Sequence, residues 1–193
     1  MLRPSFPIRT ERLLLRPFEA DDLEALYAMQ SRDDVTRYLE WGPRSRDEAQ
    51  HMLDRLMRMT AIDDHSNALR LAALLPSSGI LIGDFSLWRV SHEHNQGEIG
   101  FVVHPDHHGN GYGTEGAALL LRLGFEEVRL HRIMGRCDAR NVASARLMEK
   151  LGMRQEAHLR ENELLKGEWT DELIYAMLDR EWSAAQEPPI DRR

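Results

Sequence analysis

Three glycines alternate at positions 109, 111 and 113, between an apolar run typical of a strand and an Ala- and Leu-rich run typical of a helix. Because glycine lacks Cβ, such a backbone can approach a ligand closely and adopt φ values that other residues avoid. The first N–H groups of a helix have no partners within it, and with the helix dipole they attract anions. The segment from His108 to Thr114 predicts either an anion site suited to a diphosphate or a flexible turn before a helix.

Two familiar nucleotide-binding patterns do not describe this segment. No Gly-Lys-Ser/Thr follows the glycines, which excludes a Walker loop. A dinucleotide fingerprint requires G-x-G-x-x-G after a parallel strand, whereas the spacing here is G-x-G-x-G and the preceding runs predict antiparallel strands. A nucleotide-binding domain is therefore the least favoured functional hypothesis for this chain.

The remaining patterns predict one mixed α/β domain over residues 1–185, followed by a tail at 186–193 that contains Pro188 and Pro189. A capping box from Ser45 to Glu48 predicts the start of a helix, and Gly152 is a plausible end of another. A strand glycine predicts a bulge near Glu98–Gly100. The expected strands are 8–17, 69–75, 80–89, 98–104, 132–138, 153–165 and 169–178, and the expected helices begin near residues 21, 45, 114 and 141. About seven strands would thus form a largely antiparallel central sheet flanked by helices.

Composition narrows the function classes. The net charge of −7 argues against general binding of nucleic acid, which needs a clustered basic surface, and suits a cationic partner better. No apolar run approaches the roughly 20 residues of a membrane span, and no apolar signal core follows the N-terminus. A cytoplasmic protein is the default expectation.

Cysteine and histidine usage gives no sign of a metal site. The single cysteine, Cys137, excludes an internal disulfide and a Cys-rich zinc site, and is expected to be a small apolar strand residue. The histidines near the glycine loop lack a helical i, i+4 pair, so a solvated loop is the better interpretation. No metal is expected.

The run His108-Gly109-Asn110-Gly111-Tyr112-Gly113 resembles motif A of the GNAT superfamily of N-acetyltransferases, Gln/Arg-x-x-Gly-x-Gly/Ala, with His108 in place of Gln or Arg. Its continuation to Gly116 resembles the "GYATEA" form of the ribosomal-protein N-terminal acetyltransferase (RimJ/RimL-like) branch. Three further stretches, 10–17, 141–153 and 167–171 with Glu181-Trp182, are similar to that branch. The resemblance covers nearly the whole chain and is carried by the joint match.

The resemblance implies a fold in which acetyl-CoA lies in a V between two splayed parallel strands. The pantetheine arm would pair with backbone at Phe101, Val102 and Val103. The diphosphate would sit on the amides of the glycine loop. The donor-binding residues implied in that loop are His108, Gly109, Asn110, Gly111, Tyr112, Gly113 and Thr114.

Three further residues receive roles in the reaction. By the resemblance, the Asn141 side chain would meet the CoA arm and the Ser144 hydroxyl would lie near its sulfur as the proton donor. Asn141 is equally well explained as a helix N-cap. Glu98 is the candidate base on the central strand, with an exposed strand carboxylate as the alternative. Glu115 lies in the first helical turn, where the dipole favours a carboxylate, so a structural role is expected.

The acceptor expected from the resemblance is a primary amine, with a protein or peptide N-terminal α-amine as the first choice. An α-amine has a pKa near 7.7–8.0 and needs less deprotonation than a lysine amine near 10.4. The alternatives are a small amine, namely a polyamine, an amino acid or an aminoglycoside-like antibiotic, and a non-catalytic acyl-CoA-binding regulatory module. A homodimer is a further expectation.

Overall fold

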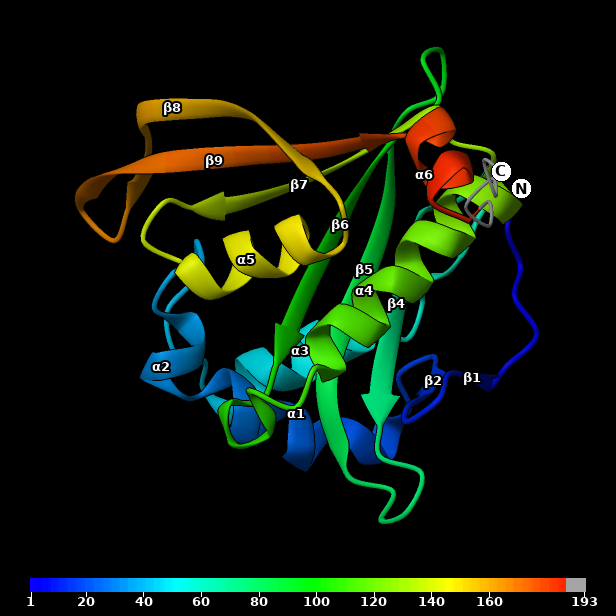
Figure 1. Cartoon of the computed structure of the whole chain (residues 1–193). Coiled ribbons are helices and arrows are strands. Elements are labelled where there is room, and N and C mark those ends of the chain that lie inside the picture. Colours follow the sequence, from blue (N-terminus) through cyan, green and yellow to red (C-terminus); the bar gives the residue numbers. More distant parts are fainter. Residues whose placement is uncertain (187–193) are drawn as a thin grey trace.

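The computed structural model describes residues 1–186 and contains one twisted sheet of nine strands (Figure 1). The sheet order is β1-β2-β4-β5-β6-β7-β9-β8, with β3 paired to β4 off this path. The strands are β1 (Ile8–Arg9), β2 (Leu14–Arg16), β3 (Thr60–Ile62), β4 (Asn67–Leu74), β5 (Leu81–Ser91), β6 (Gln96–Val103), β7 (Arg132–Asp138), β8 (Arg154–Leu165) and β9 (Glu168–Leu178).

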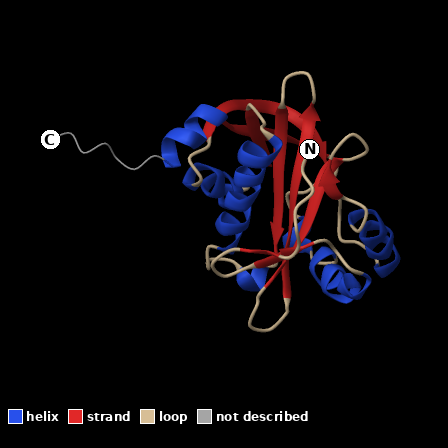
Figure 2. Cartoon of the chain, turned by 90° about the vertical axis from the view of Figure 1, so that its right-hand side faces the viewer, coloured by secondary structure: helices blue, strands red, loops and turns tan. Residues whose placement is uncertain are grey.

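Helices cover both faces of this sheet (Figure 2). They are α1 (Leu23–Gln30), α2 (Asp33–Thr36), α3 (Arg46–Leu56), α4 (Tyr112–Arg122), α5 (Val142–Lys150) and α6 (Asp179–Gln186), with 3-10 turns η1 (Ala20–Asp22) and η2 (Pro105–His107) and a π-helical turn η3 (Leu123–Val128). One buried cluster joins α4 and α5 to the sheet, and a second joins α1 and α3 to the opposite face. None of the helices within residues 1–186 is both long and apolar enough to cross a bilayer.

The only parallel contact among the described strands is short, and it divides the sheet into two parts. β6 and β7 pair over three positions, from Gln96 opposite Arg132 to Glu98 opposite Met134, and then separate. Beyond that point β6 stays paired with β5, and β7 stays paired with β9 as far as Asp138. The predicted antiparallel sheet with splayed parallel strands is confirmed.

The count of strands differs from the expected seven because two short pairings were not visible in the sequence. The first expected strand, 8–17, is broken by a turn in which the Thr10 amide donates to the Leu13 carbonyl at 3.0 Å, so that β1 and β2 pair with each other. β3 spans three residues, too few to show an alternating pattern. The proposed tail lies outside the described residues except for Gln186, which ends α6.

The bulge expected near Glu98–Gly100 is wrong. β6 runs in unbroken register against β5 from Gly97 to Val103, and the irregularity lies on β5 between Arg89 and Ser91. Close packing explains Gly97 and Gly100 instead. A Cβ on Gly97 would lie 2.5 Å from Leu130 Cδ1, and one on Gly100 would lie 2.7 Å from Ser86 Oγ.

Local helix signals in the sequence are confirmed. The Ser45 side chain accepts from the Glu48 amide, and the Glu48 carboxylate accepts from the Ser45 amide, so the capping box opens α3. Asn141 caps α5, and Gly152 follows the end of that helix with φ of 84°. These short motifs form because each satisfies backbone groups that a helix end leaves without partners.

Glu115 ties the start of α4 to the N-terminal segment. Its carboxylate accepts from Thr10 Oγ1 at 2.5 Å, from the Arg12 amide at 2.7 Å and from Arg12 Nε at 2.7 Å. Arg12 Nη1 also donates to the Asn110 carbonyl at 2.8 Å. The expected structural role of Glu115 is therefore realised, because the glycine loop before α4 is held against residues 10–12.

We predict that Glu115→Gln lowers the free energy of unfolding by about 1–3 kcal/mol near neutral pH, the scale of hydrogen bonds to a charged group. Desolvation raises the pKa of Glu115, but hydrogen bonds from Thr10 and Arg12 outweigh it and leave the pKa below its ordinary value of 4.5. A depressed carboxyl pKa stabilises the fold above the unfolded-state value, and this contribution is lost as the pH falls.

Urea denaturation across the acidic range would measure this difference. The gap between wild type and Glu115→Gln should narrow as the pH falls below about 4.5. Glu127→Gln removes an exposed carboxylate of the same chain and should change stability little at any pH. A constant gap at all pH values would contradict the ionic origin of the effect.

Candidate active site

The glycine loop presents a run of backbone N–H groups at the end of β6. Gly109 and Gly111 have φ of 77° and 81°, in the left-handed region that glycine adopts without strain. Gly111 is the N-cap of α4 and has no side-chain cap. Within residues 1–186, none of the six amides from Gly109 to Thr114 donates to a backbone carbonyl. Six such donors at the positive end of an eleven-residue helix form a site for a polyanion.

The third glycine of the loop serves packing. Gly113 lies in the first turn of α4, and a Cβ there would lie 2.8 Å from Leu147 Cδ1 on α5. By contrast, a Cβ on Gly109 would meet nothing within 4 Å. The three alternating glycines therefore have two different causes, namely backbone conformation at the first two positions and helix–helix contact at the third.

His108 connects the loop to β6. Its Nε2 lies 2.8 Å from the Val103 carbonyl oxygen. A carbonyl oxygen only accepts hydrogen bonds, so Nε2 carries the proton in this contact. His108, which replaces the Gln or Arg of the family motif, thus contacts the backbone at the end of β6. This is the strand on which Phe101, Val102 and Val103 lie.

The opening between β6 and β7 leaves one edge of β6 without a strand partner. Past Glu98, this edge has no residue of β7 opposite it. Backbone polar groups on an open edge need partners from water or from a ligand, and an extended amide-containing chain can supply them. The open edge at Ile99–Val103 and the amide run that follows it therefore fit an extended amide-containing chain that ends in phosphate groups.

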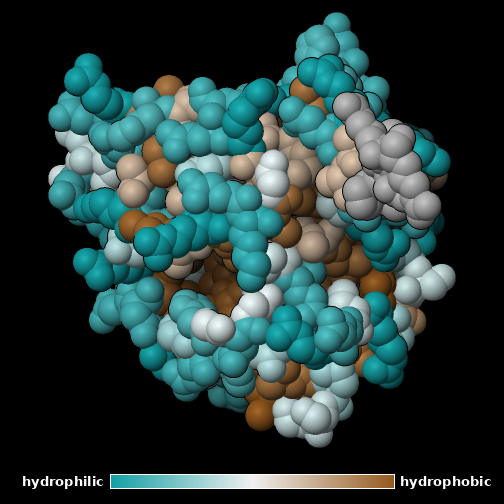
Figure 3. Space-filling view, viewed as in Figure 1, coloured by the Kyte–Doolittle hydropathy of each residue, from teal (hydrophilic) through white to brown (hydrophobic). Residues whose placement is uncertain are grey.

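A cavity of about 430 Å³ opens beside this edge. Its walls come from β4, β5, β6, β7, α1, α3, α5 and the segment between α2 and α3. Figure 3 shows the surface hollowed between α5 and the N-terminal helices. Five of the predicted site residues line it: Glu98, Phe101, Val102, Asn141 and Ser144. Val103 and the loop from His108 to Thr114 lie outside the cavity lining, further along β6 and at its end.

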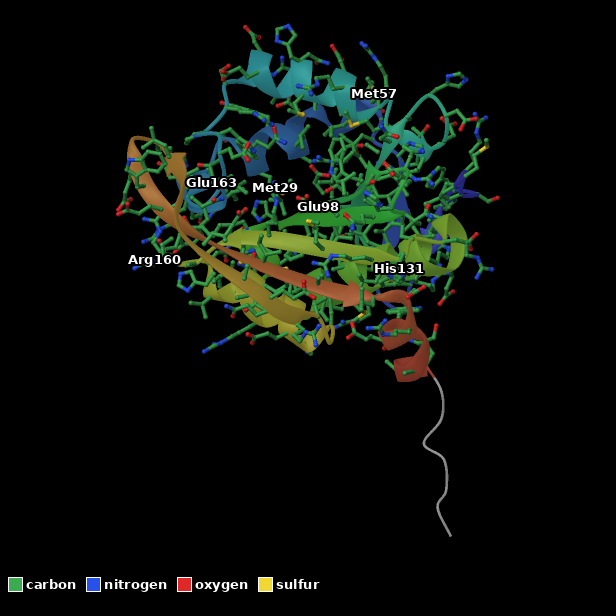
Figure 4. The ribbon with its side chains drawn as sticks, turned by 90° about the horizontal axis from the view of Figure 1, so that it is seen from above. Met29, Met57, Glu98, His131, Arg160 and Glu163 are labelled. Carbon is green, nitrogen blue, oxygen red and sulfur yellow. The ribbon has the colours of Figure 1, made fainter. Side chains whose placement is uncertain are left out.

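Glu98 lies at the point where β6 and β7 separate, and its side chain is 26% exposed. Its Oε1 accepts from Arg136 Nε at 3.3 Å. The same guanidinium donates to Glu172 at 3.0 Å and lies 3.8 Å from Glu163. Figure 4 shows Glu98 in the space below the N-terminal helices, close to Met29 of α1. Glu98 thus lines the cavity as a partly buried carboxylate, and its role as the base stays a prediction.

Ser144 and Asn141 lie at the start of α5. Asn141 Oδ1 accepts from the Ser144 amide at 3.1 Å, so the side chain of Asn141 is a helix cap. Both residues line the cavity. The Ser144 hydroxyl has no hydrogen-bond partner within the described residues, and it is available to a molecule in the cavity.

Cys137 also lines the cavity, on β7. Burial, with smaller contributions from Asp138 and Glu172, raises the pKa of its thiol to about 11. Only a thiolate is an effective nucleophile, and at neutral pH this thiol stays protonated. The site therefore favours direct transfer of an acyl group over a covalent intermediate on Cys137.

The sequence patterns did not identify the residues that form the rest of the cavity wall. These residues belong to the irregular segment after α2 and to the outer face of β4 and β5: Tyr38, Leu39, Glu40, Trp41, Arg44, Arg70, Asp84, Ser86 and Trp88. The strand residues alternate with core residues, which was a usable signal for their face. The segment 38–44 has no periodicity, so nothing in the sequence placed it over the sheet.

Within residues 1–186, no three His, Cys, Asp or Glu side chains are grouped so that they could hold a metal ion. The histidines around the loop make local contacts. His108 contacts Val103, His104 Nδ1 accepts from the Asp106 amide at 3.2 Å, and His92 lies 2.8 Å from Asn67 Oδ1.

Comparison with known proteins agrees with this geometry. A family profile described as an acetyltransferase (GNAT) domain matches residues 12–154. The uncharacterized N-acetyltransferase YnaD of Bacillus subtilis is 34% identical over 91% of this chain and 99% of its own length. The crystal structure of a GNAT-family acetyltransferase from Bacillus anthracis is 33% identical, with a TM-score of 0.80 over 90% of this chain and 99% of that one. The chain belongs to the GNAT family of acetyltransferases and is an acetyl-CoA-dependent N-acetyltransferase.

The relatives differ in acceptor. The spermidine N(1)-acetyltransferase of Vibrio cholerae is 25% identical over 83% of this chain and 89% of its own length. A Vibrio cholerae spermidine N-acetyltransferase structure with CoA and spermine has a TM-score of 0.77 at 22% identity, covering 90% of this chain and 99% of that one. A Vibrio cholerae protein provisionally assigned as a ribosomal-protein-serine acetyltransferase has a TM-score of 0.76 at 24% identity, covering 92% and 99%. These two structures show the shared fold, and neither sets the acceptor of this chain.

We predict that Gly111→Val weakens acetyl-CoA binding by roughly tenfold or more, as expected when charge-assisted hydrogen bonds are lost. Valine is strained at a φ of 81°, and its Cβ would lie 3.3 Å from Arg12 Nη2. Isothermal titration calorimetry measures the affinity. Gly79→Val is a matched control, because Gly79 has a φ of 69° in the β4–β5 turn, away from the site. Equal affinities of Gly111→Val and Gly79→Val for acetyl-CoA would show that the glycine loop is not part of the donor site.

Proposed function

We propose that this N-acetyltransferase binds acetyl-CoA along β6 and transfers the acetyl group directly to the α-amine of a peptide or amino acid held in the cavity beside Glu98. The observation that carries the proposal is the continuity of three features. The cavity and the open edge lie along β6, and the amides of Gly109–Thr114 follow in the segment after that strand.

On the donor side, the chain would contribute mainly backbone. The amides from Gly109 to Thr114 would bind the diphosphate, and the open edge at Phe101–Val103 would align the amide-containing arm. Arg12, which is 44% exposed and paired with Glu115, lies beside Asn110 and Tyr112 and holds the loop in place. The side chains of His108, Asn110 and Tyr112 would shape the loop, since the binding groups are amides.

On the acceptor side, Glu98 would accept a proton from the incoming ammonium. One of its oxygens is bonded to Arg136, which fixes the orientation of the carboxylate, and the other has no protein partner within residues 1–186. Only the neutral amine can attack the thioester that acetyl-CoA supplies, so proton removal near the point of transfer raises the rate.

Ser144 would donate a proton to the leaving thiolate, directly or through a water molecule. Its hydroxyl lies at the start of α5, on the opposite side of the cavity from β6. The positive end of this nine-residue helix favours negative charge developing nearby. Asn141 would keep Ser144 in place through the cap of α5 and would offer its amide nitrogen to the donor arm.

The charge of the cavity lining supports an α-amine acceptor. The charged residues that line it comprise three carboxylates and three guanidiniums, namely Glu40, Asp84, Glu98, Arg44, Arg70 and Arg136. A polyamine carries several positive charges at neutral pH and is recognised through an excess of carboxylates. A balanced lining with aromatic walls from Tyr38, Trp41 and Trp88 better suits a peptide or an amino acid.

A polyamine is the second candidate. Its support is the spermidine N(1)-acetyltransferase relative and the cluster of Glu98, Glu163 and Glu172 around Arg136. This cluster carries more negative than positive charge and would attract a cation to the base of the cavity.

We predict that short peptides beginning with Ser, Thr or Ala are acetylated faster than spermidine or free lysine, because their amines are neutral to a greater extent at pH 7. Thiol release and mass spectrometry of the products measure this on a panel of acceptors. Ser144→Ala should lower kcat roughly 10- to 1000-fold on the best acceptor. Turnover of spermidine with the peptides untouched would overturn the acceptor class. Binding of acetyl-CoA with no turnover on any amine would instead favour a regulatory module.

We predict that Glu98→Gln reduces kcat/KM more at about pH 6.5 than at about pH 8.5, since fewer α-amines are already neutral at the lower pH. The pH profile of the reaction with one peptide acceptor measures the effect. Glu127→Gln, an exposed carboxylate away from the cavity, is the control and should keep the wild-type profile. An equal loss at both pH values would assign Glu98 to binding of the acceptor and remove it from proton transfer.

A further inference from the structure

Arg44 lines the cavity without a carboxylate partner. It lies between α2 and α3, directly before the N-cap of α3. Its Nη1 donates to Gln30 Oε1 at 2.8 Å, and its guanidinium stacks over the Trp41 ring at 4.0 Å. Among the ion pairs of the described residues, none includes Arg44, and its Nε and Nη2 donate to no protein acceptor. The guanidinium is therefore oriented by its neighbours with donors left over.

The ion pair beside Arg44 is already complete. The neighbouring Arg70 donates from Nε and Nη2 to the Asp84 carboxylate, whose side chain is 4% exposed. The charges of Arg70 and Asp84 therefore cancel each other. Burial lowers the pKa of Arg44, with Glu48 and Asp84 opposing and Arg70 and Arg55 adding to the effect. A partly buried guanidinium without a counter-ion costs free energy, and an anion that enters the cavity would recover it.

The opposite end of the cavity is acidic. Asp84 and Trp88 lie four residues apart on β5, and Glu98 is the cross-strand partner of Trp88. The two ends are therefore separated by roughly 13 Å along the strand. At the far end, Arg136 is surrounded by Glu98, Glu163 and Glu172. The cavity has a positive end at Arg44 and a negative end at Glu98, with the open edge of β6 beside the negative end.

We infer that Arg44 is the binding site for a carboxylate of the acceptor, so that the substrates are short peptides with a free carboxylate whose amine points to Glu98. The inference rests on the proposed function and narrows its acceptor. It excludes the N-terminus of a long protein as the best substrate, since such a chain has no carboxylate within the cavity's length of its α-amine.

The charge balance selects a carboxylate over a phosphate. The Arg70–Asp84 pair is balanced, and Arg44 forms no ion pair with either Glu48 or the cavity-lining Glu40, so one carboxylate would supply the missing counter-ion of Arg44. A phosphate monoester carries about −1.5 to −2 at neutral pH and would leave negative charge uncompensated. The planar guanidinium, held flat on Trp41, also matches the two oxygens of a carboxylate.

The test compares Ala-Ala with Ala-Ala-amide at about pH 8, where a large share of α-amines is neutral. The two acceptors differ only in the terminal negative charge. We expect wild-type kcat/KM to be roughly 10- to 100-fold higher for the free carboxylate, the scale of charge-assisted hydrogen bonds. Equal values for the two peptides, or a preference for the amide, would overturn the carboxylate site while leaving the proposed acetyl transfer to an α-amine in place.

Variants assign the preference to Arg44. In Arg44→Gln the ratio of kcat/KM for Ala-Ala to kcat/KM for Ala-Ala-amide should fall to about one, because only the peptide with a free carboxylate loses an interaction. Arg55→Gln removes a charge that also acts on Arg44 but comes from an exposed side chain outside the cavity, and it should keep the wild-type ratio. A ratio unchanged in Arg44→Gln would overturn the assignment. If this variant does not fold, the wild-type comparison of the two peptides still decides.

A binding measurement separates this inference from the proposed function. The probes are N-acetyl-Ala-Ala and its amide, which have no amine and need no turnover, titrated calorimetrically into the CoA-bound protein. We expect the carboxylate to bind at least about tenfold tighter than the amide, and Arg44→Gln to abolish the difference. If this holds while no amine is acetylated, the proposed function falls and the carboxylate site stands. Equal binding of both probes to the wild type overturns the site.

Discussion

The short parallel contact between β6 and β7 is the constraint on which the rest of the site depends. Three residue pairs hold two half-sheets together, and beyond them each strand follows its outer partner, β6 with β5 and β7 with β9. A continuous sheet would pair every backbone group along β6. Because the strands part, an open strand edge is available next to Glu98 and leads directly to the glycine loop.

Packing of α4 and α5 on one sheet face stabilises this opening. On one face, α4 and α5 approach each other so closely that Gly113 leaves no room for a Cβ beside Leu147. On β7, a Cβ at Gly135 would lie 2.6 Å from Met148 Sδ, so α5 packs against the strand at the point where the opening widens. The helix that presents Ser144 is thereby held against β7, and the residues of both half-sheets face one cavity.

The charges of the cavity are organised by partly buried ion pairs. Asp84 and Arg70 neutralise each other, and Arg136 is shared by Glu98, Glu163 and Glu172. Burial raises the pKa of Glu172, Glu163 and Glu98 add to this effect, and Arg136 opposes it. Low solvent exposure strengthens each of these interactions.

Much of this protein was determined by local sequence. The alternating glycines before a helical run predict an anion site because φ preference and unpaired helix amides are properties of a few consecutive residues. The same holds for the Ser45 capping box, the Asn141 cap and β7. The resemblance to the GNAT family depended on those same short motifs.

Only the tertiary structure decided which residues face the acceptor. Glu98 forms an ion pair with Arg136 of another strand, β7. Close packing at Gly97 and Gly100 replaces the predicted bulge. The irregular segment with Trp41 and Arg44 lines the same cavity as residues of β4 and β5. These contacts join residues that are distant in sequence, and their energies depend on burial and on charges supplied by other elements. A sequence encodes local backbone preference directly, whereas the surroundings of a side chain exist only once the chain has folded.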